Sequence, residues 1–313
     1  MTDPARLASP ARMSLPPQER RKAVVLMTGA SGWLGQFVWQ RFHQEYPQPV
    51  PDKLYFDNSG MEVYGTYANH KPSWIPPERA RKMDVENEKD VVAVISELRP
   101  DVIVHLAAIS FPNVCEKDPL RGERVNNPPA FINTVKIYCP QALLIFTSSA
   151  LVYDGEHAPY KPDFDTQSFP PICAYGVSKL KAENAVLANM PKSVVLRLSN
   201  LLGPSFVYRR GEFKFMEWLY SQFKERKYLD FRYDEIRSFV YVNDVVDAIA
   251  NIVGAAIHQN SECAHKKSKH SQVDLNRVYG QRFNVGGPRG LSRLDIAEMV
   301  ARNSGVEVKI GNR

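Results

Sequence analysis

Short apolar stretches that alternate with longer amphipathic ones constrain the fold of this chain more than any other feature. The predicted strands are almost continuously hydrophobic and lie at 23–28, 62–67, 101–107, 142–148, 193–198 and 282–286. The predicted helices between them lie at 33–46, 87–98, 122–138 and 175–190. Strands that are apolar on both faces and alternate with helices are typical of a parallel sheet covered on both sides. The sequence therefore predicts an α/β fold, a Rossmann-type doubly wound parallel sheet with a smaller C-terminal substrate-binding region.

A glycine motif follows the first predicted strand and opens the first predicted helix. In "TGASGWLG" (28–35) the glycines are Gly29, Gly32 and Gly35. In this context the first glycine allows a tight turn, the second lets the backbone approach a pyrophosphate, and the third lets the helix pack on the sheet. The amides and the dipole at the helix N-terminus favour phosphate groups. The motif therefore predicts a dinucleotide-binding crossover.

The residues after the second strand decide between NAD and NADP. A carboxylate there binds the ribose hydroxyls of NAD, whereas basic residues favour the additional phosphate of NADP. If the second strand is 62–67, an Asn-His-Lys run (69–71) follows it and NADP is favoured. If the strand is instead 53–56, Asp57 follows and NAD is favoured. We prefer 62–67, because it resumes the strand pattern after a turn-rich segment.

The strongest chemical signal is "AYGVSK", which places Tyr175 and Lys179 one turn apart on one helix face. An ammonium, together with the positive ring of an oxidised nicotinamide, would stabilise the phenolate and lower the pKa of the phenol. The spacing alone fits an ordinary amphipathic helix equally well. Ser149 adds a third group at the carboxyl end of strand 142–148, outside which ligands of such folds bind. Its neighbour Ser148 is expected to point the other way.

The same pattern divides the chain into three parts. Residues 1–22 carry four arginines and four prolines but no apolar stretch, which predicts a disordered tail, with a transit peptide as the alternative. We expect an NAD(P)-binding Rossmann domain over 23–198. We expect a substrate-binding part over 199–313, in which 282–286 returns to the main sheet. Segments 47–60 and 257–280 are predicted insertions.

Composition excludes several other classes of protein. The chain has 313 residues, of which 44% are hydrophobic and 24% charged, as in an ordinary globular protein. No apolar stretch reaches the roughly 20 residues that span a bilayer, so no membrane association is expected. The net charge of +6 lies partly in 19–22 and 265–270, without the basic and aromatic stripe that favours nucleic acid. The cysteines have no metal-ligand spacing, which predicts no metal site and a reducing, cytoplasmic location; they are Cys115, Cys139, Cys173 and Cys263.

Taken together, the motifs resemble the extended short-chain dehydrogenase/reductase family. The resemblance rests on the three glycines, "HLAA" (105–108), Ser149, and Tyr175 with Lys179. Within the family, "TSSALVYDGEHAPY", "YGVSKLKAE", "VVLRLSNLLGP" and "FNVGGPRGLSRLDIAEMV" resemble the branch of dTDP-4-dehydrorhamnose reductase. That branch also contains the regulatory β subunit of methionine adenosyltransferase. The resemblance runs from about residue 23 to the end, and because family members usually continue beyond "GVEVKI", we expect a further C-terminal segment.

The resemblance implies a role for each catalytic residue. Tyr175 would be the general acid, and Lys179 would hydrogen-bond the nicotinamide ribose and tune the pKa of Tyr175. Ser149 would polarise the substrate oxygen. Asn200 would face the substrate, and Arg237 would bind the diphosphate of a nucleotide sugar through two hydrogen bonds.

The implied cofactor-binding residues lie in the loops that follow the strands and on the catalytic helix. They are Gly29, Ser31, Gly32, Trp33, Leu34, Gly35, Asn69, His70, Lys71, Asp84, Val85, Leu106, Ala107, Ala108, Tyr175 and Lys179. Asp84 would lie near the adenine, and residues 106–108 would act mainly through their backbone. Arg237 has an alternative interpretation, a surface ion pair with Asp234 or Glu235.

Departures from the family pattern limit the function. Ala150 stands where the reductases usually carry aspartate, and Ala150-Leu151 lacks the Asp-Glu pair with which dehydratases perform acid–base chemistry, so dehydration is disfavoured. Segment 110–119 also differs from the reductases, which puts sugar specificity in doubt. His105, at the end of a buried strand, is expected to be a core histidine.

The leading hypothesis is an NADP(H)-dependent reductase that transfers hydride to the C4 carbonyl of a keto-sugar nucleotide. The first alternative is an NADP-binding regulatory subunit that docks on the methionine adenosyltransferase catalytic subunit. The second is a nucleotide-sugar 4-epimerase that retains NAD. A homodimer is compatible with each of these hypotheses.

Overall fold

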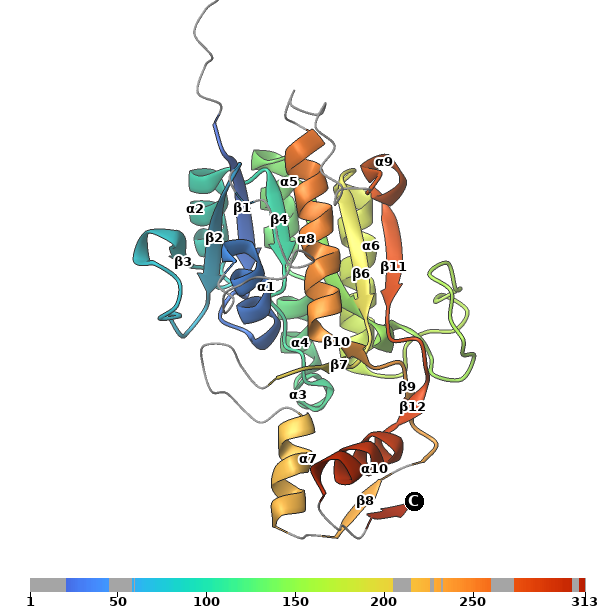
Figure 1. Ribbon diagram of the computed structural model, residues 1–313. Coiled ribbons are helices and arrows are strands. Elements are labelled where there is room, and N and C mark those ends of the chain that lie inside the picture. The colour runs from blue at the N-terminus through green and yellow to red at the C-terminus, as the bar shows by residue number, and fades with distance from the viewer. Residues whose placement is uncertain are drawn as a thin grey trace, which may run out of the picture.

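A parallel sheet of seven strands forms the centre of the computed structural model, which describes residues 21–44, 58, 60–204, 215–225, 228–231, 233–259, 273–305 and 310–312 (Figure 1). The strand order is β11-β6-β5-β4-β1-β2-β3, and each neighbouring pair is parallel. The strands are β1 (Ala23–Thr28), β2 (Met61–Tyr67), β3 (Ala80–Lys82), β4 (Val102–His105), β5 (Leu143–Ser149), β6 (Ser193–Leu198) and β11 (Gln281–Val285). The order reverses at β1, which lies between β2 and β4. The predicted doubly wound Rossmann-type fold is therefore confirmed.

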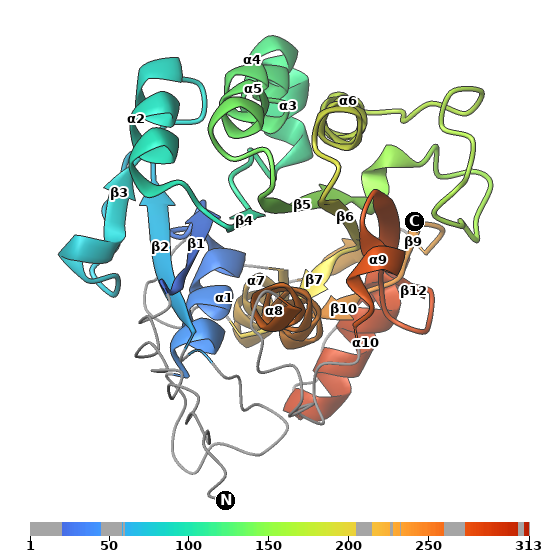
Figure 2. The ribbon, with the colours of Figure 1, turned by 90° about the horizontal axis from the view of Figure 1, so that it is seen from above.

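Helices cover both faces of this sheet. Figure 2 shows α2 (Glu88–Leu98), α5 (Pro129–Tyr138) and α6 (Ala174–Asn189) on one face, and α1 (Trp33–His43) and α8 (Val242–Gln259) on the other. Successive strand residues point to opposite faces, so each strand contributes to two cores. In β1, Val25 and Met27 pack toward α1 and α8, whereas Leu26 packs toward α2 and α5.

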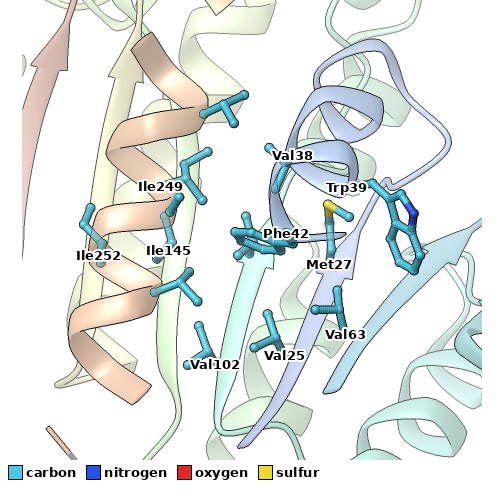
Figure 3. Packing of buried hydrophobic residues seen from close by; sticks show 14 of the residues in the cluster. Val25, Met27, Val38, Trp39, Phe42, Val63, Val102, Ile145, Ile249 and Ile252 are labelled. Atoms are coloured by element: carbon cyan, nitrogen blue, oxygen red, sulfur yellow. The ribbon is translucent and has the colours of Figure 1, made fainter. Parts of the chain in front are cut away.

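The core on the α1 and α8 face is the larger of the two. Val38 and Phe42 of α1 lie on the side facing Ile249 of α8, whereas Trp39 lies on the other side of α1, toward β2 (Figure 3). The helix α8 belongs to the chain after residue 199 and contributes to this core. We therefore propose that α8 and β11 belong to the Rossmann domain and that the rest of the C-terminal part forms the substrate-binding region.

That region lies beyond the carboxyl ends of the parallel strands (Figure 1). It contains α7 (Phe215–Lys224), β8 (Leu229–Phe231), α10 (Arg293–Ser304) and β13 (Ile310–Asn312). The helices α7 and α10 and the strand β8 share a small core that includes Leu219, Phe223 and Ile296, and β13 pairs with β8. Two short ladders lie next to it, β7 (Leu201–Leu202) with β10 (Val240–Tyr241) and β9 (Ile236–Arg237) with β12 (Leu291–Ser292). The single-turn α9 (Leu275–Val278) precedes β11.

Two of the predicted helices differ from the observed ones. The predicted helix 122–138 is two helices, α4 (Pro119–Asn126) and α5, because Pro128 and Pro129 lack the amide donor and disfavour a helical residue before them. A further helix, α3 (Pro112–Lys117), precedes them. The helix predicted over 33–46 ends at His43, since Gln44 has a left-handed backbone with φ 54°.

The edge strand β3 was not predicted. It has three residues, two of them basic, and so it shows neither the length nor the apolar character of the other strands. The second strand is β2, which pairs with β1 as the preferred reading of 62–67 requires. The alternative strand 53–56, the tail over 1–20 and most of the insertions at 47–60 and 257–280 lie outside the described residues.

Two predicted absences concern the described part of the chain. None of its helices is long and apolar enough to cross a membrane. The same part holds no group of three or more histidine, cysteine, aspartate or glutamate side chains arranged to bind a metal ion.

Candidate active site

In the glycine loop between β1 and α1, two of the three glycines stand where any larger side chain would clash with backbone atoms. Gly29 has φ +66°, and a Cβ there would lie 2.7 Å from the amide nitrogen of Ala107 after β4. A Cβ at Gly35 would lie 2.5 Å from the carbonyl oxygen of Gly29. Gly35 thus lets α1 begin directly against the turn at the end of β1. Gly32 is exposed and is the N-cap of α1, so its backbone is open to a ligand.

This loop fits a dinucleotide pyrophosphate. The 11-residue helix α1 has no acidic residue in its first turn and no side-chain cap at its N-terminus. The positive end of its dipole therefore faces the crossover between β1, β2 and β4, where a phosphate would be stabilised. Of the other predicted residues in the loop, Ser31, Trp33 and Leu34 are partly buried, and the Trp33 indole donates to the carbonyl oxygen of Pro204 at 3.1 Å.

The end of β2 carries the residues predicted to distinguish the two cofactors. Asn69, His70 and Lys71 are all exposed, with no carboxylate among them. After β3, the Asp84 carboxylate accepts from the amide of Glu86 at 3.0 Å, and Val85 is buried in the core under α2. The run after β2 therefore offers a lysine and no carboxylate, the combination that favours NADP over NAD.

Thr28, which the sequence analysis did not single out, joins the end of β1 to the loop after β4. Its hydroxyl oxygen accepts from the amides of Leu106 and Ala107, each at 3.2 Å, and lies 3.0 Å from Nδ1 of His105. The amides of Leu106 and Ala107 are thus already paired, so any contact of this loop with a cofactor involves other atoms. Ala108, the last residue of the predicted set here, is partly buried.

The His105 ring is a core histidine, as predicted. It is 1% exposed and stacks on Phe146, with Phe131 at a tilted angle. Because the Thr28 oxygen accepts two amide protons, its own proton is available to Nδ1, which suits a neutral ring. Burial lowers the pKa of His105 to about 3.

The helix α6, which carries Tyr175 and Lys179, is fixed at its start by several close contacts. Cys173 caps it, with Sγ accepting from the amide of Gly176 at 3.3 Å. A Cβ at Gly176 would lie 2.0 Å from the carbonyl oxygen of Leu151, so only glycine allows α6 to approach the short helix η3 (Ala150–Val152). Glu116 accepts from the amide of Ala174 at 2.6 Å. These contacts fix the N-terminus of α6 and therefore the position of Tyr175.

The structure brings Ser149, Tyr175 and Lys179 together at the carboxyl end of β5. Ser149 lies near enough to the Tyr175 phenol to lower its pKa, and the Ser149 hydroxyl oxygen accepts from the amide of Leu151 at 3.1 Å. The Lys179 ammonium donates to the carbonyl oxygen of Thr147 at 2.8 Å and lies 4.6 Å from the centre of the Phe146 ring. Lys179 is 2% exposed and Tyr175 is 8% exposed. The expected divergence of Ser148 also occurs, since its hydroxyl donates to Glu183.

The two ionisable groups of this site both move toward their neutral forms. Burial raises the pKa of Tyr175 to about 12, against a smaller lowering by the hydrogen bond with Ser149. Burial lowers the pKa of Lys179 to about 8, and the Glu183 carboxylate opposes that shift. In the protein alone, the pKa of Tyr175 thus moves opposite to the lowering predicted for the complex with an oxidised nicotinamide, because desolvation dominates. The phenol is therefore protonated at neutral pH.

Arg237, one of the two predicted substrate residues, forms the ion pair that was its alternative interpretation. Its guanidinium lies 3.4 Å from a carboxylate oxygen of Glu235 and is 32% exposed. Asn200 is partly buried, and its carbonyl oxygen accepts from the amide of Val240 at 3.0 Å, which joins it to β10. Both residues lie in the segments that follow β6 and precede α8. Their contact with a substrate stays a prediction.

Sequence reasoning missed two groups of buried polar residues around α6. Asn126 at the end of α4 is fully buried, accepts from the amide of Ile109 at 2.9 Å, and donates to Ser178 at 3.1 Å. Glu183 and Arg197 form a buried ion pair at 2.7 Å. The available signal for the second group was a lone arginine in the otherwise apolar strand "SVVLRL".

Comparison with known proteins identifies the family to which the chain belongs. The model of the NAD dependent epimerase/dehydratase family matches residues 25–262. The chain belongs to that family, in agreement with the resemblance shown by its motifs.

Individual relatives fall into more than one functional type. Methionine adenosyltransferase 2 subunit beta of Xenopus laevis is 32% identical over 180 residues, which are 57% of this chain and 47% of that protein. The chain thus matches about half the length of this relative. Two solved structures share the fold, each with a TM-score of 0.67. The dTDP-4-dehydrorhamnose reductase of Bacillus anthracis, in complex with NADP, is 21% identical, with 93% of this chain and 84% of that chain covered. The UDP-glucuronic acid 4-epimerase of Bacillus cereus, with UDP-glucuronic acid and NAD, is 23% identical, with 92% and 85% covered.

Proposed function

We propose that the protein is an NADP(H)-dependent reductase of a keto-sugar nucleotide, acting on the C4 carbonyl, with Tyr175 as the general acid. The observation that carries the proposal is the position of Tyr175 and the buried Lys179, one turn apart on α6, beside Ser149 at the carboxyl end of β5. The family, and the reductase structure bound to NADP, support the same reaction type and cofactor. NAD is the alternative cofactor.

The arrangement suits protonation of a carbonyl oxygen. When bound, the reduced nicotinamide supplies the hydride that reduces the carbonyl carbon. Ser149 holds the substrate oxygen by a hydrogen bond, and Tyr175 donates its phenolic proton to that oxygen. The phenol is protonated at neutral pH because burial raises its pKa to about 12. Lys179 bonds the cofactor ribose, and its ammonium stabilises the phenolate that remains.

Replacing Tyr175 tests the mechanism directly. We expect Tyr175→Phe to lower kcat for NADPH-dependent reduction of dTDP-4-dehydrorhamnose by roughly 100-fold or more, because the acid is removed. NADPH affinity, measured by fluorescence titration, should change little. Tyr138→Phe on α5 is the matched control and should keep full activity. An undiminished kcat in Tyr175→Phe would overturn the assignment.

A second function is favoured by the similarity to methionine adenosyltransferase 2 subunit beta. In this candidate the fold binds NADP and regulates a methionine adenosyltransferase catalytic subunit. The test is co-purification of a synthetase from native extract, followed by its kinetics with and without this chain. A synthetase that is neither retained nor altered in its kinetics would eliminate this candidate.

A 4-epimerase is a third candidate, for which the NAD-bound epimerase neighbour is the supporting observation. Such an enzyme retains its cofactor through the catalytic cycle. Mass spectrometry of the nucleotide released on denaturation separates the two activities, since tightly held NAD supports the epimerase and exchangeable NADP supports the reductase. A nucleotide sugar is the proposed substrate class for either activity.

A further inference from the structure

Three side chains of α6 form a row along one face of the helix and contact three consecutive residues of β5. Tyr175, Lys179 and Glu183 are four residues apart, so they lie one above another. Tyr175 lies beside Ser149, which influences its pKa, and Lys179 donates to the carbonyl oxygen of Thr147. Glu183, the third member of the row, accepts from the hydroxyl of Ser148. The contacts of Glu183 therefore continue those of the candidate catalytic pair.

Glu183 is held from three strands. Its side chain has no exposed area. The Arg197 guanidinium on β6 donates to it through Nε at 3.0 Å and Nη2 at 2.7 Å, and Nε of Arg282 on β11 lies at 3.2 Å. With Ser148 on β5, this carboxylate joins α6 to β5, β6 and β11. A buried carboxylate is tolerated only with such compensation, so its position is strongly determined.

Arg197 extends the connection to the segment that follows η3. Its second terminal nitrogen donates to the hydroxyl of Tyr153 at 2.9 Å and to the carbonyl oxygen of Pro162 at 3.0 Å. Tyr153 in turn donates to Asn284 of β11 at 2.6 Å. The position of α6 relative to the sheet is thus set by a connected network that contains neither Tyr175 nor Lys179.

We propose that Glu183 is a positioning residue for the Tyr175–Lys179 pair. It fixes the register in which α6 lies on β5, so that Tyr175 meets Ser149, and it places a negative charge one helical turn from the Lys179 ammonium. This inference rests on the proposed function of the pair.

The charged and titratable groups around Lys179 define the expected electrostatic effect. Glu183 on its own helix and Cys115 on α3 raise the pKa of Lys179, while burial lowers it to about 8. His105 on β4 is neutral, and the phenol of Tyr175 is protonated at neutral pH. Arg197 and Arg282 reach the carboxylate of Glu183 from β6 and β11 and partly neutralise it.

The test is the pH dependence of NADPH binding, followed by fluorescence between pH 6 and 10. Protonated Lys179 binds the cofactor ribose in the proposed function, so affinity in the parent protein should fall above about pH 8. Glu183→Gln retains the size and the hydrogen-bond acceptor but loses the charge. We expect its binding midpoint to move to lower pH by about half a unit or more.

Arg282→Gln is the counterpart of that variant, since it removes the opposite charge from the same cluster. Arg282 is 30% exposed, so this variant can be tested even if Glu183→Gln does not fold. We expect its midpoint to move to higher pH, because Glu183 is then less neutralised. Arg282→Lys keeps the charge and is the control, with no shift expected.

The outcomes separate this inference from the proposed function. Opposite shifts in the two variants support the positioning role. A merely structural role would lower the unfolding temperature of both variants and leave the midpoint unmoved, and that result would overturn the inference alone. A parent protein that binds no NADPH between pH 6 and 10 would overturn both the inference and the proposed function.

Discussion

At the residue scale, burial acts in opposite directions on the two ionisable groups of the candidate site. It raises the pKa of Tyr175 to about 12 and lowers the pKa of Lys179 to about 8. Near pH 7 the phenol therefore carries its proton, while the ammonium still carries its charge. This combination suits a group that donates a proton to a developing oxyanion. These protonation states are the ones that the proposed reduction requires.

His105 makes stability depend on acid. Burial lowers the pKa of His105 to about 3, against an ordinary value of 6.5. Between these two pH values His105 is therefore protonated in the unfolded chain but neutral in the folded protein. Stability that is present above pH 6.5 is lost as the pH falls toward 3. Urea unfolding at pH 7 and pH 4 should show that His105→Gln loses about 3 kcal/mol less than the parent between these values. His70→Gln, at an exposed position, should lose as much as the parent. Equal losses in the parent and in His105→Gln would contradict this account.

Lys71 tests the choice of cofactor. It is exposed after β2, where the additional phosphate of NADP would lie. We expect Lys71→Ala to weaken NADPH binding by about tenfold or more, because a charge-assisted hydrogen bond is lost, while NADH binding stays nearly constant. Calorimetric titration with both cofactors gives the two dissociation constants. Lys136→Ala on α5 makes the same charge change away from this site and serves as control. An equal loss for NADPH and NADH would refute the assignment of Lys71.

At the scale of the elements, the apolar strands were predictable because their signal is local. Each of the six predicted strands corresponds to a strand of the sheet, since a stretch buried on both faces is hydrophobic at almost every position. The break between α4 and α5 has a local cause as well, two consecutive prolines, which the reading of 122–138 as one helix overlooked. The position of α8 on the sheet was not predictable, because an amphipathic pattern indicates which helix face is buried but not which surface it packs against.

Ile249 on α8 tests whether that helix belongs to the sheet domain. Its side chain is fully buried between the sheet and α1 (Figure 3). We expect Ile249→Ala to reduce the free energy of unfolding of the whole domain by about 2–4 kcal/mol through lost burial and a cavity. Ile172→Ala, at a side chain that is 81% exposed, should change it by less than about 0.5 kcal/mol. Chemical denaturation of both variants, followed by circular dichroism, provides the comparison. If Ile249→Ala is as mild as Ile172→Ala, α8 does not complete the core.

At the scale of the whole molecule, the candidate site combines short-range and long-range features. Tyr175 and Lys179 were predictable because their spacing on one helix is visible in a few residues of sequence. The network around Glu183 was not, since Arg197 and Arg282 are 14 and 99 residues away along the chain. Only the order of strands in the sheet brings β6 and β11 next to each other and places both arginines beside α6. The sequence therefore predicts the candidate catalytic residues more readily than the contacts that hold them.

The arrangement of the molecule also relates the two parts of the chain. The glycine loop, the end of β2 and the end of β5 all lie at the carboxyl ends of the parallel strands. The C-terminal region lies beyond these strand ends (Figure 1). In doubly wound folds, ligands bind outside the carboxyl ends of the strands, where the strand order reverses. A dinucleotide on α1 and a sugar nucleotide held from the C-terminal region would thus meet beside Tyr175.

Isotope transfer tests this central claim most directly. The protein is incubated with dTDP-4-dehydrorhamnose and NADPH that carries deuterium at the transferable position of the nicotinamide. The account predicts a reduced sugar nucleotide that contains one deuterium, located at C4 of the sugar by mass spectrometry and NMR. Tight binding of NADPH without deuterium in any sugar product would contradict it.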